Sequence, residues 1–263
     1  MKKDCEQPLF AITAPGLEAL CAGELTALGL ANRPVPGGVE FHGGLREIYL
    51  ANLWLRTATR VVVRLDSFRC RSFPDLFQRT RRLPWGQFLR TQTRVEVSAS
   101  SRGSRLFHTD RIADTVREAI GHDSAVSLAP CTQRLLVRFE DDICQLSVDS
   151  SGELLHRRGY RQDAAPAPLR ETLAAAMLLL AGWDGRERLL DPLCGSGTLP
   201  IEAALLAGRR PPGAQRTFAF MDWPGYRPGL WQALQVEAVR QQADPGHSIP
   251  SGVYIYSRPP GNL

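Results

Sequence analysis

The chain has 263 residues, 43% of them hydrophobic and 22% charged, which is typical of a globular protein with two or three compact units. Its six cysteines show neither a C-x-x-C pair nor another metal-ligand spacing, so we expect reduced thiols and no bound metal. No apolar signal-peptide core follows Lys2 and Lys3, and no run is as long as a membrane span. We therefore expect a cytoplasmic protein without a membrane partner.

The formal net charge of +5 comes almost wholly from arginine, because Lys2 and Lys3 are the only lysines among 32 basic residues. Planar guanidinium groups suit the binding of phosphate. Genomic base composition explains an arginine excess about equally well, so charge alone leaves a nucleic-acid partner open.

The first part of the chain alternates short strands with amphipathic helices. Strands are predicted over 9–13, 39–41 and 61–65, and apolar residues at helical spacing predict helices over 17–28 and 45–53. Residues 1–66 are therefore expected to form a small α+β unit.

Residues 67–94 combine arginines with five interleaved aromatic side chains, and Asp75 is their only acidic residue. Cations bind phosphates and flat rings stack on unpaired bases, so this stretch suits RNA. Alternatively, the aromatic side chains form the core face of a helix over 74–83 and the arginines its solvated face. The RNA-binding candidates are Arg69, Arg71, Arg79, Arg81 and Arg82.

The pattern then predicts a strand over 95–99, a polar turn over 100–104, a helix over 110–120 and a hairpin with strands over 134–139 and 143–148. His108 and His122 flank that helix, but neither a nucleophile nor a third ligand lies beside them, so they are interpreted as surface or capping residues. An Ala/Pro-rich stretch over 163–168 indicates a linker, which places the main domain boundary near residue 160, ahead of a helix over 169–181.

Residues 189–207, LLDPLCGSGTLPIEAALLA, read as a short strand, a glycine loop and a helix. Such a unit opens a crevice at the carboxyl end of a parallel sheet, where doubly wound folds bind ligands. A P-loop is excluded because no Gly-Lys-Ser/Thr occurs, and the residues after Gly197 lack the third glycine that a dinucleotide needs. S-adenosylmethionine has no phosphate, and Asp191 is placed to meet its ammonium group.

The motif D-P-x-C-G-S-G-T-x-x-I-E-A-A over 191–204 resembles the cofactor motif of the THUMP-domain RNA methyltransferases, especially the bacterial 23S rRNA guanine-N2 methyltransferases of the RlmL type. Upstream, LFAITAPGLEALCAGELTALG, GGVEFHG, HRRGYR and LRETLAAAML resemble successive segments of the same family. The resemblance covers the chain from about residue 9 to about residue 240.

This resemblance implies a ferredoxin-like unit over 1–66, a THUMP RNA-binding domain over 67–155 and part of a class I Rossmann-type methyltransferase domain over 160–263. It also implies S-adenosylmethionine as cofactor, and 23S rRNA or its precursor particle as partner. Cys194 is interpreted as a packing or cofactor-lining residue, because no base that would activate a nucleophilic thiol is visible. By position, the cofactor-binding residues are Asp191, Cys194, Gly195, Gly197, Thr198, Glu202, Arg170, Glu171 and Thr172.

The Asn-Pro-Pro-Tyr type motif, which in this family holds the target amine, does not occur in the sequence, so the catalytic residues are unknown. Residues 253–263 resemble the second Rossmann strand, but Ser257 and Pro259 stand where acidic residues would bind the cofactor ribose. We therefore expect a truncated methyltransferase whose complete enzyme methylates N2 of a guanine in 23S rRNA. The alternative is a catalytically incomplete RNA-binding module that retains part of the methyltransferase domain.

Overall fold

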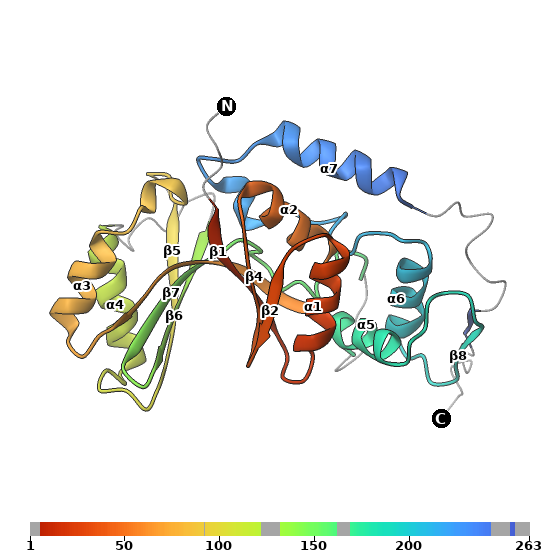
Figure 1. Cartoon of the computed structure of the whole chain (residues 1–263), viewed down its shortest axis with the longest axis horizontal. Coiled ribbons are helices and arrows are strands. Elements are labelled where there is room, and N and C mark those ends of the chain that lie inside the picture. Colours follow the sequence, from red (N-terminus) through yellow and green to blue (C-terminus); the bar gives the residue numbers. More distant parts are fainter. Residues whose placement is uncertain (1–5, 92, 122–131, 162–168, 243–252, 256–263) are drawn as a thin grey trace, which may run out of the picture.

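A computed structural model describes residues 6–91, 93–121, 132–161 and 169–242, together with the backbone of 253–255 (Figure 1). The linker predicted over 163–168, His122, Ser257 and Pro259 lie outside the described residues. None of the helices described has the length and apolar character that crossing a membrane requires.

A seven-stranded mixed sheet runs through the first 150 residues. All neighbouring strands are antiparallel except the last two, β6 and β5, and β5 forms an edge of the sheet. In spatial order the strands are β2 (Asn32–Val35), β3 (Gly38–Gly43), β1 (Gln7–Thr13), β4 (Ala58–Arg69), β7 (Ile143–Asp149), β6 (Thr132–Glu140) and β5 (Arg94–Arg102).

In the N-terminal half of this sheet, α1 (Glu18–Ala27) and α2 (Leu45–Trp54) pack against the strands. The strands predicted over 9–13, 39–41 and 61–65 and both helices are confirmed. Strand β2 was not predicted, because Arg33 and Pro34 break the apolar alternation that marks a strand. Strand β4 continues to Arg69 and therefore passes through the predicted boundary between 66 and 67.

In the second half, α3 (Phe73–Arg81) and α4 (Thr109–Ile120) pack against each other on one side of the sheet (Figure 1). A short 3₁₀ turn, η1 (Trp85–Gln87), leads into β5. The polar turn predicted over 100–104 is partly wrong, because residues 100–102 pair with β6 and extend β5. Asp141 and Asp142 close the predicted hairpin in the left-handed region (φ 48° and 66°), which Asp tolerates better than most residues.

Beyond residue 160 the chain forms a smaller unit. Helix α5 (Glu171–Leu180) packs on α6 (Thr198–Ala207), and strand β8 (Leu189–Asp191) pairs in parallel with β9 (Val253–Ile255). The predicted helix over 169–181, the strand–loop–helix unit and a second parallel strand starting at 253 are confirmed.

Residues 211–240 leave this unit and return to the sheet. They form η2 (Ala219–Asp222) and α7 (Pro228–Arg240), which extends over α2 (Figure 1). The Phe220 ring stacks on Tyr49 with centroids 4.4 Å apart, and Trp231 meets Tyr49 edge-on at 5.9 Å. The N–H of Gly213 donates to the carbonyl of Leu53 (2.9 Å). Side chains from beyond residue 160 therefore complete the core of the first 150 residues.

Candidate functional site

The glycine loop between β8 and α6 is shaped by its own backbone. Gly195 and Gly197 adopt φ of 52° and 76°, a region that favours glycine, and the N–H of Gly197 donates to the carbonyl of Cys194 (2.8 Å). Asp191 ends β8 half-buried, and its Oδ1 accepts from the N–H of Leu193 (3.1 Å). The turn therefore presents a carboxylate and two side-chain-free positions at the end of a parallel strand.

The starts of α5 and α6 are joined by an arginine that was not predicted as a site residue. Arg161 Nη2 donates to Thr198 Oγ1 (3.0 Å), and the same nitrogen lies 3.0 Å from Glu171 Oε1. Thr198 and Glu171 are buried, as is Thr172, whereas Arg170 is exposed at the N-terminal boundary of α5. The signal was present in the sequence, because Arg161 is the last residue of the HRRGYR segment.

Glu202 lies one turn further along α6 and is engaged elsewhere. Its side chain is fully buried, with Oε1 3.5 Å from Arg158 Nε and accepting from the Tyr160 hydroxyl (3.1 Å). Burial raises the pKa of the Glu202 carboxyl, and the charge of Arg158 opposes that rise. The structure therefore brings Thr198 and Glu171 together through Arg161 but gives Glu202 separate partners.

Cys194 is partly exposed, with its Sγ 3.8 Å from the carbonyl oxygen of Gly195. Cys21, Cys70 and Cys144 are free and buried. Within the described residues, no group of three His, Cys, Asp or Glu side chains is arranged to hold a metal.

The arginines predicted to bind RNA lie on β4, on α3 and in the turns that flank this helix. Arg71 pairs with Asp142 (2.6 Å), and Arg79 pairs with Asp75 (3.1 Å). Arg69, Arg81 and Arg82 are exposed and form no ion pair within the described part of the chain.

The aromatic side chains interleaved with these arginines belong mainly to the core. Phe68 and Phe88 are buried, Phe73, Phe77 and Trp85 are half-buried, and Arg79 lies over the Phe68 ring at 4.9 Å. This placement agrees with the interpretation that the rings form a core face and the arginines a solvated face.

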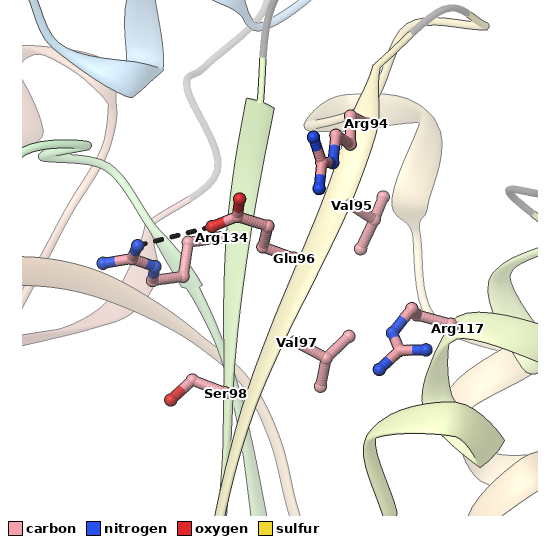
Figure 2. Close-up of a pocket in the computed structure, with 7 residues that line it drawn as sticks. All are labelled: Arg94, Val95, Glu96, Val97, Ser98, Arg117 and Arg134. Atoms are coloured by element: carbon pink, nitrogen blue, oxygen red, sulfur yellow. Dashed lines mark hydrogen bonds and ion pairs between the residues drawn. The ribbon is translucent and has the colours of Figure 1, made fainter. Parts of the chain in front are cut away.

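A cavity of about 490 Å³ runs along the edge strand β5. Figure 2 shows Arg94, Val95, Val97 and Arg117 around it, while Glu96 holds Arg134 by an ion pair of 3.3 Å. Sequence reasoning did not group these arginines, because they come from β5, α4 and β6 and only the fold brings them together.

Comparison with known proteins gives matches along nearly the whole chain. Three family models match in succession: the RlmL ferredoxin-like domain over 8–62, the THUMP domain over 70–149 and the RMKL-like methyltransferase domain over 158–250. The ribosomal RNA large subunit methyltransferase K/L of Methylococcus capsulatus is 41% identical over 252 residues, which cover 90% of this chain and 34% of that protein.

Two solved structures resemble the chain over most of its length. SMU.472, solved in complex with SAH (S-adenosylhomocysteine), has a TM-score of 0.84 and 33% identity, covering 96% of this chain and 68% of that one. A Listeria monocytogenes protein named a predicted N6-adenine-specific DNA methylase has a TM-score of 0.83 and 34% identity, covering 90% of this chain and 65% of that one.

The chain spans about a third of the length of the curated K/L relatives that it matches. Its ferredoxin-like unit, THUMP domain and part of a methyltransferase domain confirm the predicted fold class. The chain belongs to the family of RlmL-like, THUMP-domain RNA methyltransferases that depend on S-adenosylmethionine.

Proposed function

We propose that the loop between β8 and α6 binds S-adenosylmethionine and that the THUMP half binds the RNA that receives the methyl group. The observation that carries this proposal is the geometry of the loop, with its left-handed glycines beside the carboxylate of Asp191. The 33% identity to a structure solved with SAH supports the same ligand. Because the partner proposed is ribosomal RNA, we expect the chain to act in the cytoplasm.

The residues of the loop fit this cofactor. A Cβ added to Gly195 would meet no atom within 4 Å, so the backbone there is open to close approach by a ligand. Asp191 can accept from the ammonium group of the cofactor's methionine part, and Leu193, 92% exposed, adds an apolar surface at the same place. When bound, the cofactor supplies the methyl group, and the residues of this chain hold and orient it.

For the methyl acceptor, we propose N2 of a guanine in 23S rRNA in the complete enzyme. The K/L relatives, named as ribosomal RNA large subunit methyltransferases, support this choice. A guanine in a paired region must be flipped out of its stack before its amine can reach a methyl donor. A basic surface on the THUMP half would hold the surrounding backbone meanwhile.

For that basic surface we propose the exposed arginines of α3 and its flanking turns, together with Arg94, Arg117 and Arg134 along β5. Each guanidinium that neutralises a phosphate releases a condensed counterion, so binding weakens as salt rises. Arg69, Arg81 and Arg82 form no ion pair among the described residues and can meet phosphates directly.

One experiment tests both parts of the proposal. Calorimetry with SAH should show binding to the wild-type chain and a marked loss in Asp191→Asn, whereas Asp184→Asn, an exposed Asp outside the loop, should bind as the wild type does. Absence of SAH binding to the wild-type chain would overturn the cofactor assignment.

In the second arm, fluorescence anisotropy with 23S rRNA fragments is measured across salt concentrations. Replacing Arg81, Arg82 and Arg94 together with Gln should weaken binding and reduce the salt slope by about 2 to 3. Arg33→Gln and Arg46→Gln, on β2 and α2, provide the control. RNA binding without SAH binding would support the second candidate, an RNA-binding module with an incomplete methyltransferase domain.

A further inference from the structure

Helix α6, which carries the end of the glycine loop, is held by residues from outside the methyltransferase unit. Arg56 lies in the ferredoxin-like unit, between α2 and β4, and is only 6% exposed. Its Nη2 donates to the carbonyls of Arg210 (2.7 Å) and Leu205 (3.3 Å), at the C-terminal end of α6. The last carbonyls of a helix have no partner within the helix and favour a cation, so Arg56 fixes this end of α6.

Arg158 connects the middle of the same helix to the same unit. Its Nη2 donates to the carbonyl of Arg56 (2.6 Å) and its Nη1 to the carbonyl of Leu155 (2.7 Å), while its Nε faces Glu202. Arg158 and Glu202 are both almost wholly buried, with side chains 2% and 0% exposed. Because breaking a buried pair leaves an uncompensated charge, this connection has a strong geometric preference.

The two connections and Arg161 hold α6 along its whole length. Arg161 bonds to Thr198 at the first residue of the helix, Arg158 and Tyr160 hold Glu202 in its second turn, and Arg56 holds its last carbonyls. Arg56 in turn is fixed to α1, because its backbone N–H donates to Glu24 Oε1 (2.8 Å). A rotation or shift of α6 against the ferredoxin-like unit would break several of these bonds at once.

We propose that Glu202 is a positioning residue rather than a cofactor ligand, and that Arg56, Arg158 and Tyr160 act through it and α6 to set the cofactor loop from the RNA-binding half. The orientation of the loop is thus tied to the part of the chain that binds RNA. The affinity for the cofactor then depends on residues that never touch it. The inference rests on the proposed cofactor function of the loop, but the holding of α6 can be tested without any ligand.

The test uses Tyr160→Phe and Arg56→Met, because Tyr160 and Arg56 form these bonds without being predicted to contact the cofactor. Tyr160→Phe removes a single hydroxyl group that donates to Glu202, and Arg56→Met removes the donor to the α6 carbonyls. Arg64→Met is the matched control: Arg64 is also a half-buried arginine paired with a carboxylate (Glu40, 2.6 Å), but it does not touch α6. Arg56→Lys keeps a donor and should restore most of what Arg56→Met loses.

Two quantities are measured on the full chain, hydrogen exchange of the α6 amides without ligand and SAH affinity by calorimetry. Both Tyr160→Phe and Arg56→Met should speed exchange in α6 while exchange in α1 and the large sheet and affinity for rRNA fragments stay at wild-type values. SAH affinity should fall by about 5-fold or more, the lower end of typical coupling between linked sites. Arg64→Met should change neither quantity.

Wild-type exchange in α6 and wild-type SAH affinity in both variants would overturn the inference. Faster exchange spread over the whole chain would also overturn it, because Arg56 and Tyr160 would then be general stabilising residues. If the wild-type chain binds no SAH, the proposed function fails and the exchange data alone decide. If Arg56→Met does not fold, the single-hydroxyl variant Tyr160→Phe decides.

Discussion

Replacing Trp223 with Phe should destabilise the fold although Trp223 lies beyond residue 160. The indole is 2% exposed, its Nε1 donates to Gln133 Oε1 on β6 (2.7 Å), and its ring meets Phe88 edge-on at 5.0 Å. Phe would leave the buried Gln133 oxygen without this donor, which costs about 1–3 kcal/mol. The smaller ring adds about 1 kcal/mol for lost packing, so the free energy of unfolding should fall by roughly 2–4 kcal/mol.

Thermal unfolding followed by circular dichroism measures this effect. For a chain of this size, each kcal/mol lowers Tm by about 2–4 °C, so Trp223→Phe should lower Tm by roughly 4–16 °C. Trp183→Phe is the matched control, since its indole also donates, to the carbonyl of Glu187 (3.0 Å), but it is partly exposed and water can replace the bond. We expect a change within about 0.5 kcal/mol there. Equal Tm values for the two variants would refute the reasoning.

Two further predictions concern a hairpin turn and the glycine loop. The N–H of Arg105 and the guanidinium of Arg71 lower the pKa of Asp142, so its stabilising effect is present above the unfolded pKa of about 3.9 and is lost as pH falls through the folded value. The Tm gap between wild type and Asp142→Asn should therefore be open at neutral pH and close in acid; a gap independent of pH would contradict this. Gly197→Ala, at φ 76° with only Ile201 nearby, should introduce strain of about 1–2 kcal/mol into the loop and weaken SAH binding in calorimetry. Gly182→Ala, at φ 68° with no atom within 4 Å, carries similar strain outside the loop, so equal SAH affinities for the two would argue against the assignment.

The sequence predicted those parts of the fold that depend on neighbouring residues. The helix that ends before Gly29, the hairpin closed by Asp141 and Asp142, and the turn at Gly195 and Gly197 are all local patterns of apolar spacing or of positive φ. Strand β2 escaped prediction, since its pairing with β3 depends on a neighbour and not on its own polar residues.

What the sequence could not predict are meetings of distant residues. Glu202 matches the family motif, but its partners Arg158 and Tyr160 lie more than 40 positions away, and only packing of α6 brings them to it. Likewise, Arg94 was visible as one of many arginines, whereas its neighbours Arg117 and Arg134 around the β5 cavity are assembled by the sheet.

The return of residues 211–240 to the large sheet has a consequence for the order in which the chain folds during synthesis. When the first 155 residues have been made, Tyr49 still lacks the rings of Phe220 and Trp231, and Gln133 lacks its indole donor. Domains usually fold as units while the ribosome is still working. Here the RNA-binding half cannot complete its core until the cofactor loop has already been synthesised, so neither half matures alone.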